Sequence, residues 1–207
     1  MPLLTSLADL QGRAAQCNSL IANAHMTDAS GAVLFPLIDR QQITVAAFLN
    51  LFIAWESFVE DAMTKLMSGS STISGTYPTR YVTPPTQDAA KTLIIGVNRY
   101  FDYSNIEFVK RLVKMYFLNG YPFEPHLSSI TTDLADLRTM RNASAHITST
   151  TQLALESLAQ RIFSTPKPSI DLYTFLTSVH PSSTSSSTVF DESRDKLLAA
   201  ASLIATG

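Results

Sequence analysis

Residues 45–55 form an almost uninterrupted apolar run, Val45-Ala46-Ala47-Phe48-Leu49-Asn50-Leu51-Phe52-Ile53-Ala54-Trp55. A helix that is apolar nearly all round is typical of the centre of a bundle. Asn50 interrupts the run, and the run is too short to span a bilayer. We therefore expect a buried helix, extending from about Asp39 to Met67.

Helical spacing of apolar residues recurs on both sides of this run. Before it, the spacing predicts a first helix with the stripe Leu3, Leu7, Leu10, Ala14, Cys17 and Ile21. After it, helices are predicted at about 87–101, 104–119, from 131 onward, 149–163, 170–179 and 190–205. Capping-box spacing marks two of these starts, at Ser104-Asn105-Ile106-Glu107 and Ser149-Thr150-Thr151-Gln152. Loops or turns are expected at 25–38, 68–86, 121–125 and 181–188.

The length of 207 residues suits one domain with a single core. We predict a single-domain all-α helical bundle over residues 1–207, with about six to eight helices and irregular connections. The sequence is 45% hydrophobic and only 15% charged, which indicates extra buried surface, such as a subunit interface.

The net charge of −2 provides no overall basic field for nucleic acid, so any RNA contact must come from a local cluster. Cys17 is the only cysteine, which excludes an internal disulfide and argues against a cysteine zinc site. The sequence contains no Gly-rich phosphate loop or HExxH motif, and we expect neither a metal nor a cofactor. The N-terminus lacks a signal-peptide pattern, so a cytoplasmic protein without a membrane partner is expected.

The strongest chemical signal is the segment Arg141-Asn142-Ala143-Ser144-Ala145-His146. It places a permanent cation and a near-neutral acid/base side chain five positions apart, at or near the end of a predicted helix. A guanidinium can clamp a phosphate, and an imidazole can move a proton at neutral pH. This pair suits phosphodiester cleavage.

A purely structural interpretation of the segment is also open. Arg141 falls on the same helical stripe as Leu134 and Leu137, and it can pair there with Asp136 or Glu56. His146 can simply cap the helix end.

The pattern Arg-Asn-x-x-x-His near a helix end of an all-α domain resembles the signature of the HEPN superfamily. Arg141, Asn142 and His146 occupy the three motif positions. Residues 54–60 look like the aromatic-rich long helix of these domains, and residues 159–163 and 197–204 are similar to the RiboL-PSP-HEPN branch. The resemblance covers about residues 39–205, and residues 1–38 would add an N-terminal helix and loop.

This resemblance implies a homodimer in which two motifs form a composite site across the subunit cleft. It also implies a metal-independent endoribonuclease that acts on RNA, as an effector in toxin–antitoxin, phage-defence or RNA-processing systems, with an antitoxin or defence protein as a further partner. Other members lack the motif and serve as non-catalytic dimerisation or partner-binding modules, which is the alternative. A weaker third hypothesis is a helical nucleotide-binding or regulatory domain.

The chemistry follows from the residue types. RNA supplies its own nucleophile, the ribose 2′-hydroxyl. His146 would remove its proton or protonate the leaving 5′-oxygen, and the partner subunit's His146 would do the other task. Arg141 would stabilise negative charge in the transition state, and Asn142 would orient His146 or bind a phosphate oxygen.

Three further residues can support this site. Glu56 is either a polar member of the site or a buried partner for an arginine. Arg138, one turn before Arg141, can extend phosphate binding, although a solvated pair with Asp133 or Asp136 is favoured. Ser144 offers a hydroxyl, but we favour a small packing residue.

Other candidates have ordinary explanations. Lys110, Arg111 and Lys114 can track an RNA backbone, but such runs more often form a solvated face. Tyr77, Arg80 and Tyr81 can stack on bases, or simply anchor their loop. The remaining histidines are interpreted as surface or loop residues: His25, His126 and His180.

Overall fold

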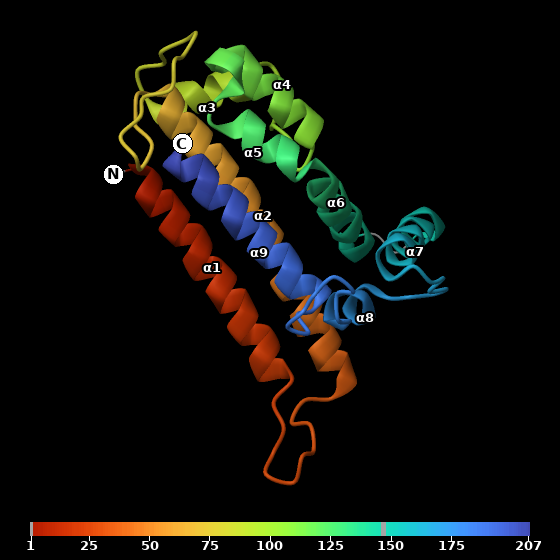
Figure 1. The fold of residues 1–207 in the computed structure, drawn as a ribbon. Coiled ribbons are helices and arrows are strands. Elements are labelled where there is room, and N and C mark those ends of the chain that lie inside the picture. The colour runs from red at the N-terminus through yellow and green to blue at the C-terminus, as the bar shows by residue number, and fades with distance from the viewer. Residues whose placement is uncertain (1, 146–147) are drawn as a thin grey trace. The chain divides into compact units, whose positions relative to one another are not determined.

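The computed structural model describes residues 2–145 and 148–207. These residues form nine α-helices and no strand, and 67% of the chain is helical, which confirms the all-α helical bundle (Figure 1). The helices are α1 (Pro2–Ala24), α2 (Leu37–Met67), α3 (Gln87–Ile95), α4 (Ile106–Tyr116), α5 (Phe123–Ser129), α6 (Thr131–Ala145), α7 (Ser149–Phe163), α8 (Leu172–Thr177) and α9 (Val189–Thr206), with a 3-10 turn, η1, at Leu118–Gly120.

The chain forms two compact units. Unit 1 consists of Met1–Gln11, Ala54–Ala135 and Lys196–Gly207, and unit 2 consists of Gly12–Ile53 and Asp136–Asp195. Helices α1, α2, α6 and α9 each contribute residues to both units. That residues 1–207 form one domain stays a prediction.

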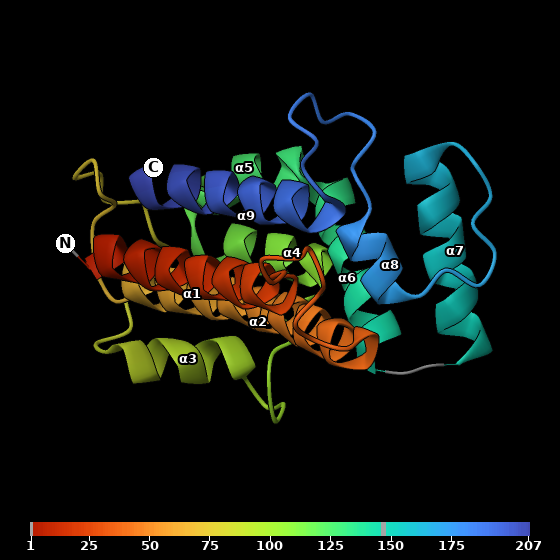
Figure 2. The same ribbon diagram turned by 90° about the horizontal axis from the view of Figure 1, so that it is seen from below.

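In unit 1, the N-terminal part of α1 lies beside the C-terminal parts of α2 and α9 (Figure 1 and Figure 2). A buried polar group links two of them, because the Ser6 hydroxyl donates to Asp61 Oδ2 at 2.6 Å and Lys65 Nζ donates to the same carboxylate oxygen at 2.7 Å. The apolar stripes of the three helices supply buried core residues: Leu3, Leu7, Leu10, Trp55, Phe58, Leu197, Ala201 and Ile204. The predicted stripe of α1 is thus confirmed at these positions.

The loop predicted at 68–86 is present and anchored. Arg80 Nη1 donates to the carbonyl oxygen of Met67 at 2.9 Å, and the Ile73 N–H donates to that of Ala205 at 2.8 Å. Arg80 therefore anchors the loop, whereas Tyr77 and Tyr81 are exposed.

Two boundaries in unit 1 differ from the prediction. Helix α3 ends at Ile95 rather than near 101, because Gly96 follows with a φ of +59°. The segment predicted as a turn at 121–125 instead opens the short helix α5, with Pro122 at its N-cap and Pro125 in its first turn. Proline is tolerated there, because the first-turn N–H groups have no partner within the helix.

In unit 2, α1 contacts helices from the C-terminal half of the chain. Arg194 Nη1 donates to Asn18 Oδ1 at 2.7 Å, and the His25 Nε2 and Tyr173 hydroxyl lie 3.1 Å apart. The Phe163 and Phe175 rings pack edge to face with their centroids 5.7 Å apart. These contacts fix α7 and α8 as parts of the unit.

Helix α2 is less completely buried than expected. Phe48, Leu51 and Phe52 are buried, but Ile53 is 50% exposed and Val45 and Leu49 are partly exposed. Among the described residues, α2 is the one helix that passes a length and composition test for crossing a membrane. Half of its most apolar window is buried in the described structure.

Candidate functional site

The end of α6 carries the described part of the motif. Leu134, Leu137 and Met140 are buried, and Arg141 follows at the edge of this stripe with a half-buried side chain. Asn142 and Ser144 are also half-buried, whereas Ala145 is exposed. The structure therefore places the described part of the motif, residues 141–145, at the boundary between core and solvent.

The Arg141 guanidinium has a neutral neighbour. Its Nη1 donates to Asn142 Oδ1 at 3.3 Å. Among the described residues, no carboxylate lies within 4 Å of its nitrogens to form an ion pair. Its expected partner Asp136 instead forms an ion pair with Arg161 of α7. The structural interpretation of Arg141 as half of an Arg141–Asp136 pair is therefore wrong.

His146 lies outside the described residues. Its position relative to Arg141, and the role of Asn142 in orienting its ring, stay predictions. The helix that carries the motif ends at Ala145 in the described residues, and α7 begins at Ser149. The Thr148 side chain caps α7 and forms a capping box with Thr151, one residue earlier than predicted.

Ser144 has a local structural role. Its hydroxyl donates to the backbone carbonyl oxygen of Arg141 at 2.6 Å, one helical turn earlier. The bond satisfies one of the carbonyl groups that lack a partner at a helix end. Ser144 thus steadies the backbone under Arg141.

The two other supporting candidates are half-buried. Glu56 lies on α2 within unit 1, and Arg138 lies on α6 within unit 2. Asp133 pairs with Lys196 at 2.6 Å and Asp136 pairs with Arg161, and both Asp136 and Arg138 have further interactions. The roles of Glu56 and Arg138 in the site stay predictions.

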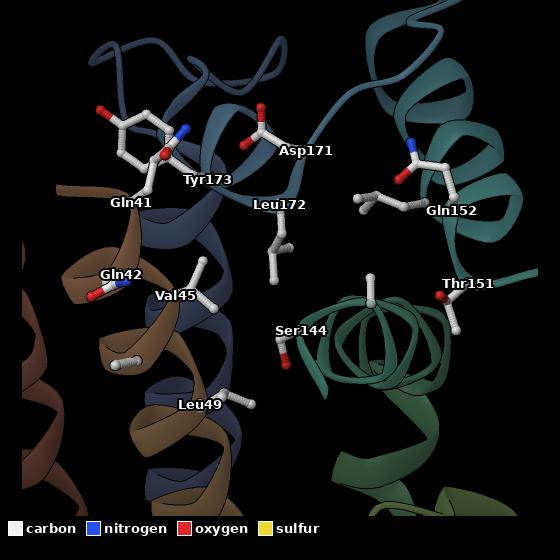
Figure 3. A pocket seen from close by; sticks show the side chains of 13 residues that line it. Gln41, Gln42, Val45, Leu49, Ser144, Thr151, Gln152, Asp171, Leu172 and Tyr173 are labelled. Carbon is white, nitrogen blue, oxygen red and sulfur yellow. The ribbon is translucent and has the colours of Figure 1, made fainter. Parts of the chain in front are cut away.

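A pocket of about 480 Å³ opens in unit 2 beside the motif. Figure 3 shows Val45 and Leu49 of α2 pointing toward Leu172 of α8 and Ser144 of α6. Leu155 and Gln152 of α7 complete the wall. The walls are mainly aliphatic, and the motif residues Ala143 and Ser144 form part of them.

The polar groups of the pocket are mostly neutral. Gln152 Nε2 donates to the Ile170 carbonyl oxygen and to Glu156 Oε1, both at 3.0 Å. The hydrogen bond from Gln152, with another from the Ser169 N–H, lowers the pKa of Glu156. Asp171 contributes a carboxylate, but it caps α8 by accepting from the Thr174 N–H at 2.9 Å. No cationic side chain is found among the described residues that line the pocket.

The basic residues of α4 fit a structural role. Lys114 pairs with Glu124 at 3.0 Å, and this contact lowers the pKa of Glu124. Lys110 lies 3.9 Å from Glu107, and Arg111 is exposed. Lys114 is therefore already paired with a carboxylate, whereas the contact of Lys110 with Glu107 is loose.

The histidines are placed in three different settings. His25 bonds Tyr173 in unit 2, and the Nδ1 of His180 lies 2.8 Å from the Ser182 hydroxyl. His126 lies in α5, where partial burial lowers its pKa, so it is not a loop residue. Within residues 2–145 and 148–207, no group of three or more His, Cys, Asp or Glu side chains is arranged to hold a metal ion.

The sequence matches no protein-family model, and it is similar to no curated protein and no solved structure. The site is therefore interpreted from its own residues. Sequence reasoning missed Gln41, Gln152 and Tyr173, which line the pocket. The only signal in the sequence was the occurrence of amide side chains at the borders of apolar helices.

Proposed function

We propose that the chain is a metal-independent endoribonuclease in which Arg141 and His146 act on the scissile phosphodiester. One observation supports this most directly: Arg141 is half-buried and pairs with no carboxylate among the described residues. A partly desolvated guanidinium without a counter-ion is costly, and an anionic ligand would offset that cost. Two oxygens of one phosphate can accept hydrogen bonds from the planar guanidinium of Arg141 at the same time.

In this proposal the ribose 2′-oxygen attacks the phosphorus and the bond to the 5′-oxygen breaks. One imidazole removes the 2′-proton, and a protonated imidazole donates a proton to the leaving 5′-oxygen. Arg141 stabilises the additional negative charge on the phosphorane-like transition state. The products are a 2′,3′-cyclic phosphate and a 5′-hydroxyl end, and the mechanism requires no metal because the nucleophile belongs to RNA.

The test is cleavage of a labelled RNA in EDTA. Arg141→Ala should reduce the rate by about 10²–10³-fold, and Arg141→Lys should restore only part of it, because lysine lacks the bidentate fork. His146→Ala should reduce the rate by about 10²–10⁴-fold. Arg13→Ala, at an exposed position of α1, is the matched control and should cleave like the wild type. Wild-type cleavage by Arg141→Ala would refute the proposal.

A homodimer with a composite site is part of the same proposal, and the segment 34–38 at the start of α2 supports it. Four large apolar side chains are exposed within five positions there: Leu34, Phe35, Leu37 and Ile38. Exposed apolar clusters mark interaction surfaces. The same observation favours the second candidate function, a non-catalytic dimerisation or partner-binding module, which predicts a dimer that does not cleave RNA.

We further propose a cytoplasmic effector of toxin–antitoxin or phage-defence type. The free, buried thiol of Cys17 suits a reducing compartment. A toxic ribonuclease should arrest growth of the cells that express it, and Arg141→Ala should relieve that arrest. Equal toxicity of the two proteins would contradict this role.

A further inference from the structure

Two residues of α6 line the pocket in unit 2, Ala143 and Ser144, and Arg141 precedes them on the same helix. Ser144 lines the pocket and follows Arg141 by three residues, so the two positions lie about 60° apart around the helix and about 4.5 Å apart along it. The Ser144 hydroxyl, which bonds the Arg141 carbonyl oxygen at 2.6 Å, links the pocket wall to the turn that carries the guanidinium. A ligand with its phosphate at Arg141 would have to extend by about one helical turn, roughly 5 Å, to reach the pocket wall at Ser144.

The described lining residues offer no positive charge to a ligand. No cationic side chain lines the pocket among the described residues, so a phosphate gains nothing inside it. The Asp171 carboxylate is already engaged, because its two oxygens accept from the Thr174 N–H at 2.9 Å and the Thr174 hydroxyl at 2.7 Å. These lining residues therefore favour an uncharged group in the pocket.

The aliphatic walls suit a flat ring. Val45 and Leu49 stand on one side, with Leu155 and Leu172 also lining the space. The volume of about 480 Å³ falls within the range of small-molecule sites, about 300–1,000 Å³. RNA bases are flat heterocycles with apolar faces and polar edges. Single-stranded RNA can place an unstacked base in such a pocket.

The polar edge of the pocket has a defined orientation. Because Gln152 Nε2 is held by the Ile170 carbonyl oxygen and Glu156, its amide oxygen is left as an acceptor. Gln41 forms no hydrogen bond with any described residue, so its amide offers one donor and one acceptor. Figure 3 shows Gln41 and Gln152 on either side of Leu172. The amide of a glutamine can bind adenine through two hydrogen bonds, one accepted from the exocyclic amino group and one donated to a ring nitrogen. The amide oxygen of the second glutamine is a further acceptor for an exocyclic amino group.

We propose that this pocket binds the base of the nucleotide next to the scissile phosphate, with adenine as the preferred base. This inference rests on the proposed endoribonuclease, because the phosphate at Arg141 is what brings the base to the pocket. It makes the pocket the determinant of cleavage-site preference. Free adenosine, which is uncharged, should also bind there without any cleavage.

The experiment measures binding of adenosine and uridine to the full chain by calorimetry, in parallel with cleavage of an RNA that contains both bases. Ala46→Phe fills the pocket from an exposed position of α2, and Ala22→Phe, exposed on α1, is its control. Gln41→Leu removes the free amide, and Gln16→Leu, exposed on α1, is its control. Thermal melting checks that each variant is folded.

We expect adenosine to bind more tightly than uridine, and Gln41→Leu to weaken adenosine binding by about 10-fold with a smaller effect on uridine. Ala46→Phe should abolish both, while the controls bind like the wild type. In the two pocket variants, the RNA should no longer be cleaved faster next to adenine than next to uracil.

The two proposals fail in different ways. Adenosine binding that Ala46→Phe abolishes, in a protein that does not cut RNA, supports the pocket and contradicts the nuclease. RNA cleavage that needs Arg141, without adenosine binding and with an unchanged site preference in Ala46→Phe, supports the nuclease and overturns the pocket. Equal affinity for adenosine and uridine also overturns the inference of an adenine preference.

Discussion

Asp136 of α6 and Arg161 of α7 form an ion pair across the link that joins the two helices. The Asp136 side chain is 19% exposed and the Arg161 side chain 52% exposed, so solvent screens the pair only in part. The pair keeps a carboxylate away from Arg141 and ties α7 to the helix that carries the motif.

A double-mutant cycle with Asp136→Asn and Arg161→Gln should give a coupling free energy of about 0.5–1 kcal/mol. Urea unfolding followed by the fluorescence of Trp55, which is 2% exposed, measures it. The cycle is needed because Asp136 has further contacts that a single variant would also remove. The matched control is the looser pair of Lys110 and Glu107 at 3.9 Å, where Glu107 is 60% exposed and the coupling should be near zero. Equal coupling in the two cycles would show that Asp136 and Arg161 do not interact as described.

The same substitution at two glycines should have opposite effects on stability. Gly12 lies inside α1, and an added Cβ would meet no atom within 4 Å. Gly12→Ala should stabilise the protein by about 0.5–1 kcal/mol, because alanine loses less backbone entropy in a helix. Gly120 has a φ of +70°, and an added Cβ would lie 2.8 Å from the Cβ of Glu124. Gly120→Ala should destabilise by about 1–3 kcal/mol, as measured by urea unfolding. Changes of the same sign would contradict the described backbone at one of these glycines.

Periodicity predicted which faces of the long helices are buried, because that information is local. The α1 stripe from Leu3 to Cys17 is buried at every third or fourth residue, as the pattern requires. The start of α7 was displaced by one residue, because Thr148 with Thr151 and Ser149 with Gln152 have the same capping spacing. Local chemistry alone does not distinguish these two starts.

The pocket was not predictable from the sequence, for a different reason. Val45 of α2 meets residues of three consecutive helices there, Ser144 of α6, Gln152 of α7 and Leu172 of α8, and α2 is far from these helices in the chain. In the sequence Val45 and Leu49 are simply apolar, and an apolar residue packs equally well against a core or a ligand. The site thus combines a motif that local reasoning finds with a cavity that only tertiary packing creates.

Lowering the pH from 7.5 to 5.5 should destabilise the protein in part through His126. Partial burial in α5 lowers the pKa of this imidazole below its ordinary value of 6.5. The unfolded chain therefore binds more protons than the folded protein in this range, and stability falls as the pH drops below about 6.5. His126→Gln removes the titrating group, so its melting temperature should fall less steeply between pH 7.5 and 5.5. Identical slopes for the variant and the wild type would show that the His126 pKa does not change on folding.

The exposed apolar segment 34–38 at the start of α2 provides a test of the proposed dimer. Ile38 is 58% exposed and Leu34 is 55% exposed, and two copies of the chain would bury such side chains against each other. Ile38→Glu would place an unpaired charge in that interface and should raise the dimer dissociation constant by roughly 100-fold. Leu203→Glu, at a 51% exposed position of α9, is the matched control and should leave association unchanged.

Sedimentation velocity over a concentration series measures the effect of Ile38→Glu, and RNA cleavage is measured on the same samples. Because a composite site needs both copies, cleavage should fall in proportion to the loss of dimer, and raising the protein concentration should restore it. A variant whose chemistry alone is damaged would not recover in this way. A dimer that Ile38→Glu leaves intact would place the interface elsewhere, and a wild-type protein that is monomeric at all concentrations yet cleaves RNA would contradict the composite site itself.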